Sequence, residues 1–116
     1  MRLEFATRLF RRLGRNFFGP RLLVPMRVEE LPDRLNPEMV YIVGEGEHLW
    51  YVAMLCPCRC GKTLHMNLMP HSRPRWTVTT HRDGTVTLQP SVWRRTGCSS
   101  HFFVRRGKVI WWLSDT

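Results

Sequence analysis

The chain has 116 residues, 43% of them hydrophobic and 23% charged, which suits one small domain with its own core. Its net charge of +9 predicts a basic surface that attracts nucleic acid, anionic lipid or an acidic protein. No apolar run reaches the roughly 20 residues that a membrane-spanning helix needs, which excludes a transmembrane helix. The first residues do not form a secretory leader, so we expect a cytoplasmic protein with reduced cysteines.

Residues 1–20 are predicted to form a segment of their own, with a basic amphipathic helix over residues 3–18. Apolar side chains recur every four residues from Phe5 to Phe17, and arginines occupy the rest of the cylinder. Gly19-Pro20 ends the pattern. We expect this helix to pack against its own domain, because exposed aromatic side chains are costly, and binding to a membrane or partner is the alternative.

Residues 21–116 have the pattern of a small antiparallel β domain. Strands are expected over residues 22–28, 39–43, 48–56, 64–68, 76–80, 85–89, 102–105 and 109–112. Residues 48–56 are apolar almost throughout, which is typical of a central strand. Asp83-Gly84 and Arg106-Gly107 predict the turns of two hairpins. The expected fold class is therefore mainly β within an α+β arrangement, with one N-terminal helix.

The cysteines predict a metal site. Cys56, Cys58 and Cys60 are packed into five residues, and Cys98 comes three residues before His101. Thiolates at this density usually share a metal, and zinc is the first candidate. We expect the four cysteines to hold one structural Zn²⁺ in a knuckle between two loops.

The sequence leaves the ligand set open. Cysteines two apart on a straight strand lie about 7 Å from each other, and sulfurs on one zinc lie within about 4 Å, so the chain must bend. Pro57 and Gly61 supply that bend. His101 is able to replace one cysteine, most easily Cys56, and buried free cysteines are a further alternative. If all four cysteines bind, His101 stays free for other chemistry.

Ser91 is the candidate nucleophile. It lies in the segment QPSVW, just past the expected strand end at residue 89, where a side chain can be presented at the rim of a sheet. A metal that holds the turn at Cys98 would carry His101 towards the same rim, and a histidine beside a serine is the minimum for nucleophilic catalysis. On spacing alone, a turn serine bonded to its own backbone is the commoner role. The candidates for a third, orienting group are Asp83, Glu45 and Glu47.

The five tryptophans allow a second kind of partner. Aromatic rings beside a basic groove would suit single-stranded nucleic acid, whose bases stack on such rings. However, the tryptophans lie within or beside expected strands, so we expect them mostly in the core. Nucleic acid is therefore the less favoured partner.

Several segments, taken in order, resemble a bacterial domain family of unassigned function. They are CPCRCG at 56–61, RPRW at 73–76, DGTVTLQPSVW at 83–93, CSSHFF at 98–103 and RGKVIW at 106–111. Members of that family contain CPCGCG, then TLxPS, then CxSHF followed by a hairpin. The resemblance covers residues 39–112 and leaves the N-terminal segment outside. Arg59 stands where members often have glycine.

The resemblance implies a function. Such domains are encoded in bacterial operons that resemble ubiquitin conjugation, beside ubiquitin-like proteins and their activating and conjugating enzymes. It implies a serine peptidase that processes or removes the ubiquitin-like modifier, in antiphage defence, with Ser91 as nucleophile and His101 as general base. The alternatives are a non-enzymatic zinc-binding adaptor for conjugation enzymes, a nucleic-acid-binding module, and a zinc hydrolase with His101 as a ligand.

Overall fold

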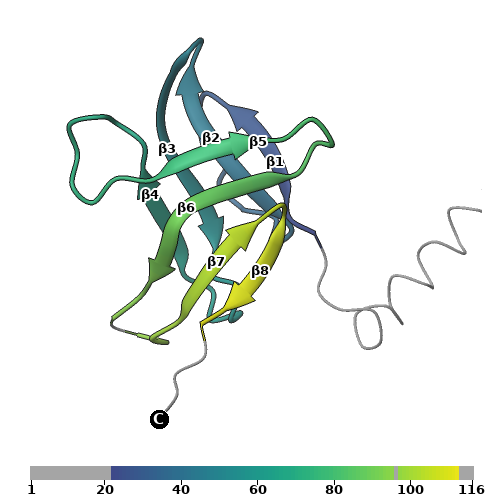
Figure 1. Cartoon of the computed structure of the whole chain (residues 1–116), viewed down its shortest axis with the longest axis vertical. Helices are drawn as coiled ribbons and strands as arrows, with labels where there is room; N and C mark the ends of the chain where they lie inside the picture. The colour runs from purple at the N-terminus through teal and green to yellow at the C-terminus, as the bar shows by residue number, and fades with distance from the viewer. Residues whose placement is uncertain (1–21, 96, 113–116) are drawn as a thin grey trace, which may run out of the picture.

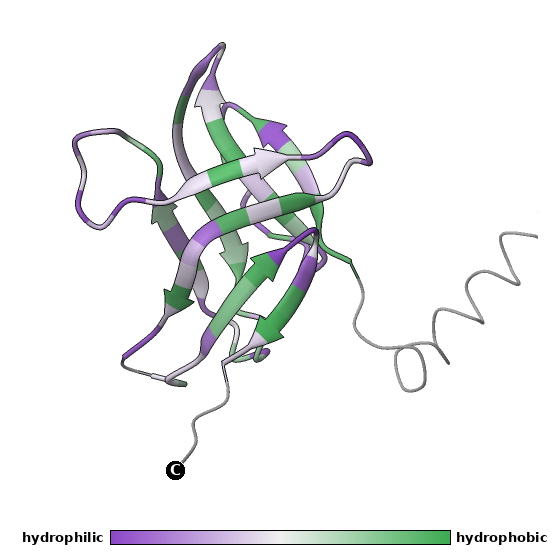
Figure 2. Ribbon diagram, viewed as in Figure 1, coloured by the Kyte–Doolittle hydropathy of each residue, from purple (hydrophilic) through white to green (hydrophobic). Residues whose placement is uncertain are grey.

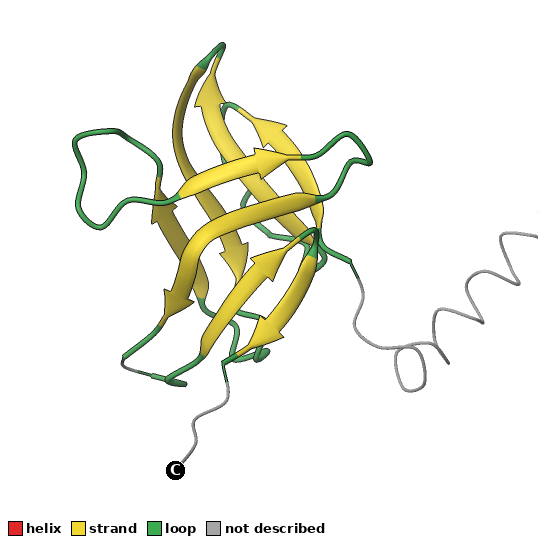
Figure 3. Cartoon of the chain, in the orientation of Figure 1, coloured by secondary structure: helices red, strands yellow, loops and turns green. Residues whose placement is uncertain are grey.

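The computed structural model describes residues 22–95 and 97–112, which form two four-stranded β-sheets that face each other (Figure 1). The strands are β1 (Val24–Val28), β2 (Met39–Glu45), β3 (His48–Leu55), β4 (Thr63–Asn67), β5 (Thr77–Thr80), β6 (Val86–Trp93), β7 (His101–Arg105) and β8 (Lys108–Trp111). Every regular element in the described ranges is a strand (Figure 3), which confirms the mainly β fold class. The helix expected over residues 3–18 lies outside them. This described part of the chain has no helix suited to crossing a membrane.

The first sheet has the order β1-β2-β3-β4, and β3 is internal to it, as its apolar sequence predicted. β3 pairs antiparallel with both neighbours, so the strand after the cysteine knuckle partners the strand before it. β1 and β2 are parallel, whereas an antiparallel arrangement was expected. The reason is the connection over residues 29–38, which brings the chain back to the end of the sheet at which β1 begins, so that β2 runs in the same direction as β1.

That connection also covers the outer face of the first sheet. Leu31 and Leu35 pack against a small cluster that includes the buried Tyr41 and Val43. The hydroxyl of Tyr41 accepts a hydrogen bond from the backbone N–H of Asn36 at 2.8 Å. The outer face of this sheet is therefore partly closed.

The second sheet has the order β5-β6-β7-β8 and is antiparallel throughout, as predicted. Its two hairpin turns contain the predicted Gly84 and Gly107. Arg106 and Gly107 both have positive φ, 49° and 80°, which matches the twist of a tight hairpin turn. The backbone of Gly107 accepts a hydrogen bond from Leu23 N–H at 2.7 Å, which joins the β7–β8 turn to the start of the first sheet.

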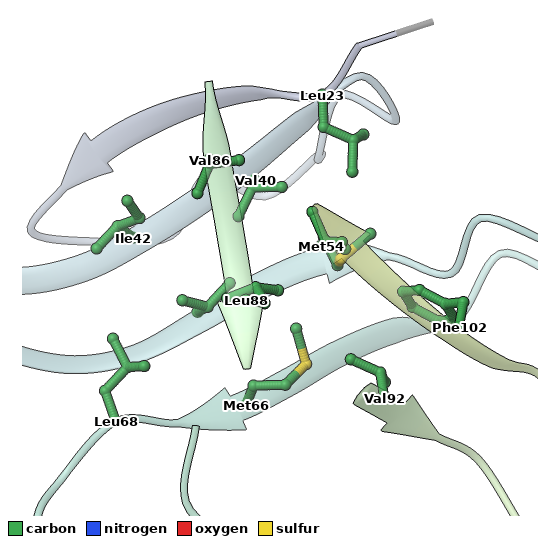
Figure 4. Packing of buried hydrophobic residues seen from close by; sticks show 12 residues of the cluster. Leu23, Val40, Ile42, Met54, Met66, Leu68, Val86, Leu88, Val92 and Phe102 are labelled. Atoms are coloured by element: carbon green, nitrogen blue, oxygen red, sulfur yellow. The ribbon is translucent and has the colours of Figure 1, made fainter. Parts of the chain in front are cut away.

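The main core lies between the two sheets (Figure 4). Alternate residues of each strand point into it, so hydrophobic and hydrophilic residues are interleaved along the strands (Figure 2). The buried members are Leu23, Val40, Ile42, Val52, Met54, Met66, Leu68, Val86, Leu88, Val92, Phe102 and Val104. On β6 and β7 the residues between these core positions face away from the core. The outer face of the second sheet is thus where the remaining side chains of β6 and β7 gather.

The expectation that the tryptophans mostly fill the core is wrong. Trp93 is 56% exposed, Trp112 is 55% exposed and Trp111 is 43% exposed. Trp76 packs against the main core, where it is partly buried. The others are exposed because smaller residues already occupy the inward positions, such as Val92 beside Trp93.

Candidate functional site

Ser91 lies on an irregularity in β6. The sequence predicted that this strand ends at residue 89, but it continues to Trp93. Leu88 faces Val104 and Val92 faces Phe102, so the β6 residues 89–91 lie opposite the single β7 residue at position 103. This is a β-bulge, a feature that redirects side chains and often occurs beside active sites.

Pro90 accounts for the bulge. Proline has no N–H to give to a ladder and is confined in sheets to edges and irregular positions. β6 is an internal strand, paired with β5 on one side and β7 on the other, so the chain must bulge at Pro90. Within the bulge, the Ser91 carbonyl accepts a hydrogen bond from the indole Nε1–H of Trp76 at 3.3 Å. Because Trp76 packs on the core, this bond fixes the bulge relative to the domain interior.

The structure brings Ser91 and His101 together. The hydroxyl Oγ of Ser91 lies 2.8 Å from Nε2 of His101, and both residues are half-buried. Trp93 pairs with His101 across the strands, and Ser91 lies two residues before Trp93 on β6. Ser91 and His101 therefore lie side by side on the outer face of the sheet. The distance lies within the range in which a histidine removes a serine proton, provided that Nε2 carries no hydrogen. The two side chains are therefore close enough for proton transfer between them.

None of the three predicted carboxylates hydrogen-bonds to His101 in the described ranges. Asp83 instead accepts bonds from the backbone and hydroxyl of Thr85 in the β5–β6 turn, at 3.0 and 2.6 Å. The same carboxylate lies 3.5 Å from a guanidinium nitrogen of Arg106. These bonds, those from Thr85 above all, hold the pKa of Asp83 below its usual value. Glu45 ends β2 and Glu47 lies in the following turn, both in the first sheet.

Aromatic rings enclose the imidazole of His101. The ring of Trp93 stacks on the imidazole, with centroids 4.9 Å apart and an interplanar angle of 11°. The ring of Trp112 stacks at 5.1 Å and 24°. Phe103 lies 6.1 Å away on the same strand. Sequence reasoning missed these neighbours because it assigned the tryptophans to the core, although the alternation along β6 carried the signal.

The four predicted cysteines converge at one point. The Sγ atoms of Cys56, Cys58, Cys60 and Cys98 all lie within 4.8 Å of one another. Cys56 Sγ lies 3.4 Å from Cys58 Sγ and 3.6 Å from Cys98 Sγ. Sulfurs bound tetrahedrally to zinc at about 2.3 Å would be about 3.8 Å apart, so the cluster fits such an ion closely. The four cysteines can therefore hold a metal ion, and His101 is not among the four residues of this cluster.

One comparison with known proteins decides the family. The matching family model is described as bacterial ubiquitination-like system serine protease (BubE), and it matches residues 27–112. The chain belongs to this family. The match includes Ser91, His101 and the four cysteines, and it confirms the resemblance to a domain family of ubiquitin-like operons. No curated protein and no solved structure matches the chain significantly.

Membership of the BubE family supports a general role as a serine protease in a bacterial ubiquitination-like system. It also gives a context for partners, because proteins of such a pathway are the ones with which the chain would interact.

In this BubE-family chain the cysteine cluster is surrounded by hydrogen-bond donors. Arg94 donates to the Sγ atoms of Cys60 and Cys98 at 3.2 and 3.0 Å. The hydroxyl of the buried Ser100 lies 3.0 Å from Cys98 Sγ. A positive charge and hydroxyl donors favour thiolates, which are the form that binds a metal.

These contacts change the acidity of the cluster. The hydrogen bond to Ser100, above all, lowers the pKa of the Cys98 thiol to about 6. The backbone hydrogen bond to Lys62, above all, lowers the pKa of Cys60. The pKa of Cys58 is raised to about 12, chiefly by its hydrogen bond to Cys98.

Arg59 occupies a backbone conformation that favours glycine. Its φ is +73°, and its N–H donates to the carbonyl of Cys56 at 3.0 Å in the turn of the knuckle. The left-handed conformation costs a residue with a side chain about 1 kcal/mol. The glycine of the CPCGCG motif is thus the residue that this turn prefers, and this chain departs from the motif at a strained position.

Arg59→Gly is expected to stabilise the metal-loaded protein by about 0.5 kcal/mol, because relief of strain exceeds the greater freedom that glycine gives the unfolded chain. The free energy of unfolding in urea measures the effect. The exposed Arg34 does not have a positive φ, so Arg34→Gly is the matched control and should destabilise the protein. Equal losses in both variants would contradict the assignment of strain to Arg59.

The cysteine cluster lies next to the strand end that carries His101. Cys56 follows β3 of the first sheet, and Cys98 precedes β7 of the second. The N–H of Arg94 donates to the carbonyl of Ser100 at 2.7 Å, immediately before His101. A metal ion bound here would tie the two sheets together beside the strand end that carries His101.

Proposed function

We propose that this chain is a serine peptidase in which Ser91 and His101 process the C-terminus of a ubiquitin-like modifier or release the modifier from a target. One observation carries the proposal: the 2.8 Å hydrogen bond between Ser91 Oγ and His101 Nε2, on a bulge of a solvent-facing sheet. The family, described as a serine protease of a bacterial ubiquitination-like system, supports the substrate class. The activating and conjugating enzymes of the same pathway are the further proposed partners.

The proposed reaction follows from the chemistry of the pair. Ser91 Oγ attacks the carbonyl carbon of the last residue of the modifier, while Nε2 of His101 removes the hydroxyl proton. The same nitrogen then gives that proton to the departing amine, and an ester joins the modifier to Ser91. Water, deprotonated in turn by His101, hydrolyses the ester and restores the serine. Backbone N–H groups of the bulge are the proposed donors to the oxyanion, and Pro90 is not one of them.

We assign the orientation of His101 to aromatic neighbours. Asp83, Glu45 and Glu47 are not in contact with the imidazole, whereas Trp93 and Trp112 stack against it at 4.9 and 5.1 Å. Stacked rings restrict rotation of the imidazole and keep Nε2 directed at Ser91. Trp93 and Trp112 are positioning residues in this proposal, and they do not exchange protons.

We propose that the metal is zinc and that its role is structural. Four thiolates complete a tetrahedral set, and a catalytic zinc would need an open position. The ion would hold the knuckle against the segment before His101, and bond breaking belongs to Ser91 and His101 alone. This assignment places His101 outside the ligand set, in contrast to the zinc-hydrolase alternative.

The test uses the purified chain and a ubiquitin-like protein that carries a C-terminal extension or an attached target. Mass spectrometry of the products should show cleavage directly after the C-terminal residue of the modifier. A fluorophosphonate, which reacts with activated serines, should label Ser91 and no other serine, as located by peptide mapping. If neither cleavage nor labelling occurs with the folded, metal-loaded chain, the adaptor function replaces the peptidase function.

A further inference from the structure

A groove of about 530 Å³ lies beside Ser91 on the outer face of the second sheet. Ser91, Phe103 and Arg105 contribute to its lining, together with Arg75 at the edge of the sheet. His101, Phe103 and Arg105 are alternate residues of β7 and so point to the same face. Since Ser91 contacts His101 and the groove extends past Phe103 to Arg105, His101 and the groove lie on opposite sides of the serine.

This arrangement fixes which part of a substrate enters the groove. His101 must give its proton to the departing amine, so the departing group lies on the His101 side. The residues before the cleaved bond then lie on the Phe103 side, in the groove. This step rests on the proposed peptidase function.

The groove is basic. Two guanidinium groups, those of Arg75 and Arg105, belong to its lining, and no carboxylate does. Residues 73–112 contain eight lysine and arginine residues and one acid, Asp83. Asp83 is already paired with Arg106 at 3.5 Å and so does not neutralise the groove. A negatively charged side chain placed here meets cations on two sides.

The groove also has an apolar surface beside its charges. The guanidinium of Arg105 lies 5.8 Å from the ring centroid of Phe103, which is half-buried. Thr77 and Thr87 add hydroxyl groups to the lining. A glutamate fits this combination, because its methylene groups can lie on Phe103 while its carboxylate reaches Arg105 or Arg75.

We propose that the groove is a specificity site for an acidic side chain of the modifier, located two or three residues before the cleaved bond. The position follows from the strand spacing: Arg105 lies two residues beyond Phe103 along β7, a distance of about 7 Å, which two extended substrate residues span. Arg105 and Arg75 select the carboxylate, and Phe103 supports its stem. The substrate class is therefore a modifier whose tail is acidic close to its end.

The proposal is tested with peptides that carry glutamate, glutamine or lysine at the second or third residue before the cleaved bond. Wild type should cleave the glutamate peptide with a kcat/KM about 10-fold above that of the glutamine peptide, mainly through a lower KM, as expected for one paired charge. Arg105→Glu should reverse the order of glutamate and lysine, and Arg105→Gln should abolish the preference. Arg82→Glu is the charge-matched control. It lies in the β5–β6 turn outside the groove, and it should keep the wild-type order.

A fluorophosphonate separates failure of this proposal from failure of the peptidase function. Wild type and the control Arg82→Glu should both label at Ser91 at equal rates, and any labelling of Arg105→Glu shows that this variant is folded with its nucleophile in place. The specificity site is wrong, and the peptidase function stands, if wild type labels but cleaves the three peptides equally. The same conclusion follows if Arg82→Glu changes the order of the glutamate and lysine peptides as much as Arg105→Glu does. If wild type neither labels nor cleaves, the peptidase function is wrong, and the specificity site falls with it.

Discussion

Ser91→Ala is expected to lower kcat for cleavage of an extended ubiquitin-like protein by about 1000-fold or more, the scale seen when a serine nucleophile is removed. The hydroxyl on the bulge is the proposed attacking group, and Ser100, the serine next to His101 in the sequence, is not placed to replace it. Ser100 is buried against the cysteine cluster, with its hydroxyl 3.0 Å from Cys98 Sγ. Single-turnover cleavage followed by mass gives the rate. The free energy of unfolding should change by less than about 1 kcal/mol, because Ser91 loses one half-buried hydrogen bond.

The same experiment distinguishes a catalytic pair from two separate residues. His101→Gln should lower kcat to a similar extent, and the double variant should be no worse than either single variant, because the two side chains act as a unit. Ser72→Ala, far from the bulge in sequence and outside the groove, is the control and should retain full activity. If Ser91→Ala cleaves at the wild-type rate with its metal bound, Ser91 is a turn serine and the nucleophile has been assigned wrongly.

Cys98→Ser is expected to remove the metal, destabilise the domain by about 4 kcal/mol or more and abolish cleavage. Binding of a structural zinc contributes on the order of 10 kcal/mol to folding, which is comparable to the entire stability of a domain of this size. Cys98 is the proposed ligand that connects the second sheet to the knuckle, so its loss should free the segment before His101. Thermal denaturation with metal quantified on the same sample measures the effect. Removal of the metal from wild type by a chelator, followed by addition of zinc, is the matched reversible test.

Exchange of the metal separates a structural role from a catalytic one. Protein loaded with cobalt or cadmium should cleave at the rate of the zinc form, because the proposed mechanism gives the ion no part in bond breaking. A rate that follows the identity of the metal would favour the zinc-hydrolase alternative. If Cys98→Ser keeps one equivalent of metal and full activity, the four-cysteine site is contradicted.

The sequence predicted the strands well because their signals are local. The alternation of Leu64, Met66 and Leu68 with polar residues identified β4, and a glycine at each turn identified the two hairpins. The parallel pairing of β1 with β2 was not predictable in this way. It depends on the path of residues 29–38, which is set by the packing of Leu31 and Leu35 on the far side of the sheet.

The cysteine cluster was the best-predicted part of the candidate site, because ligand type and spacing both occur in the sequence. The contact between Ser91 and His101 was harder, since it depends on the β6–β7 register and on a bulge. Pro90 within an apolar stretch was the available signal, as proline does not fit an internal strand. The enclosure of His101 by Trp93 and Trp112 was missed for a different reason. Composition alone places tryptophan in the interior, and only the strand alternation shows which face it occupies.

The uneven distribution of charge gives the described domain an electric polarity. Residues 22–72, which form the first sheet, contain six acids and four basic residues, whereas residues 73–112 contain eight basic residues and one acid. At low ionic strength an approaching anionic protein is therefore rotated towards the second sheet before any contact forms, and each encounter is more often productive. Since the Debye length shortens to about 8 Å at physiological ionic strength, this orientation acts only over the last part of the approach. Within the described residues, the sheet that carries Ser91 and His101 is thus also the one that attracts an anionic partner more strongly.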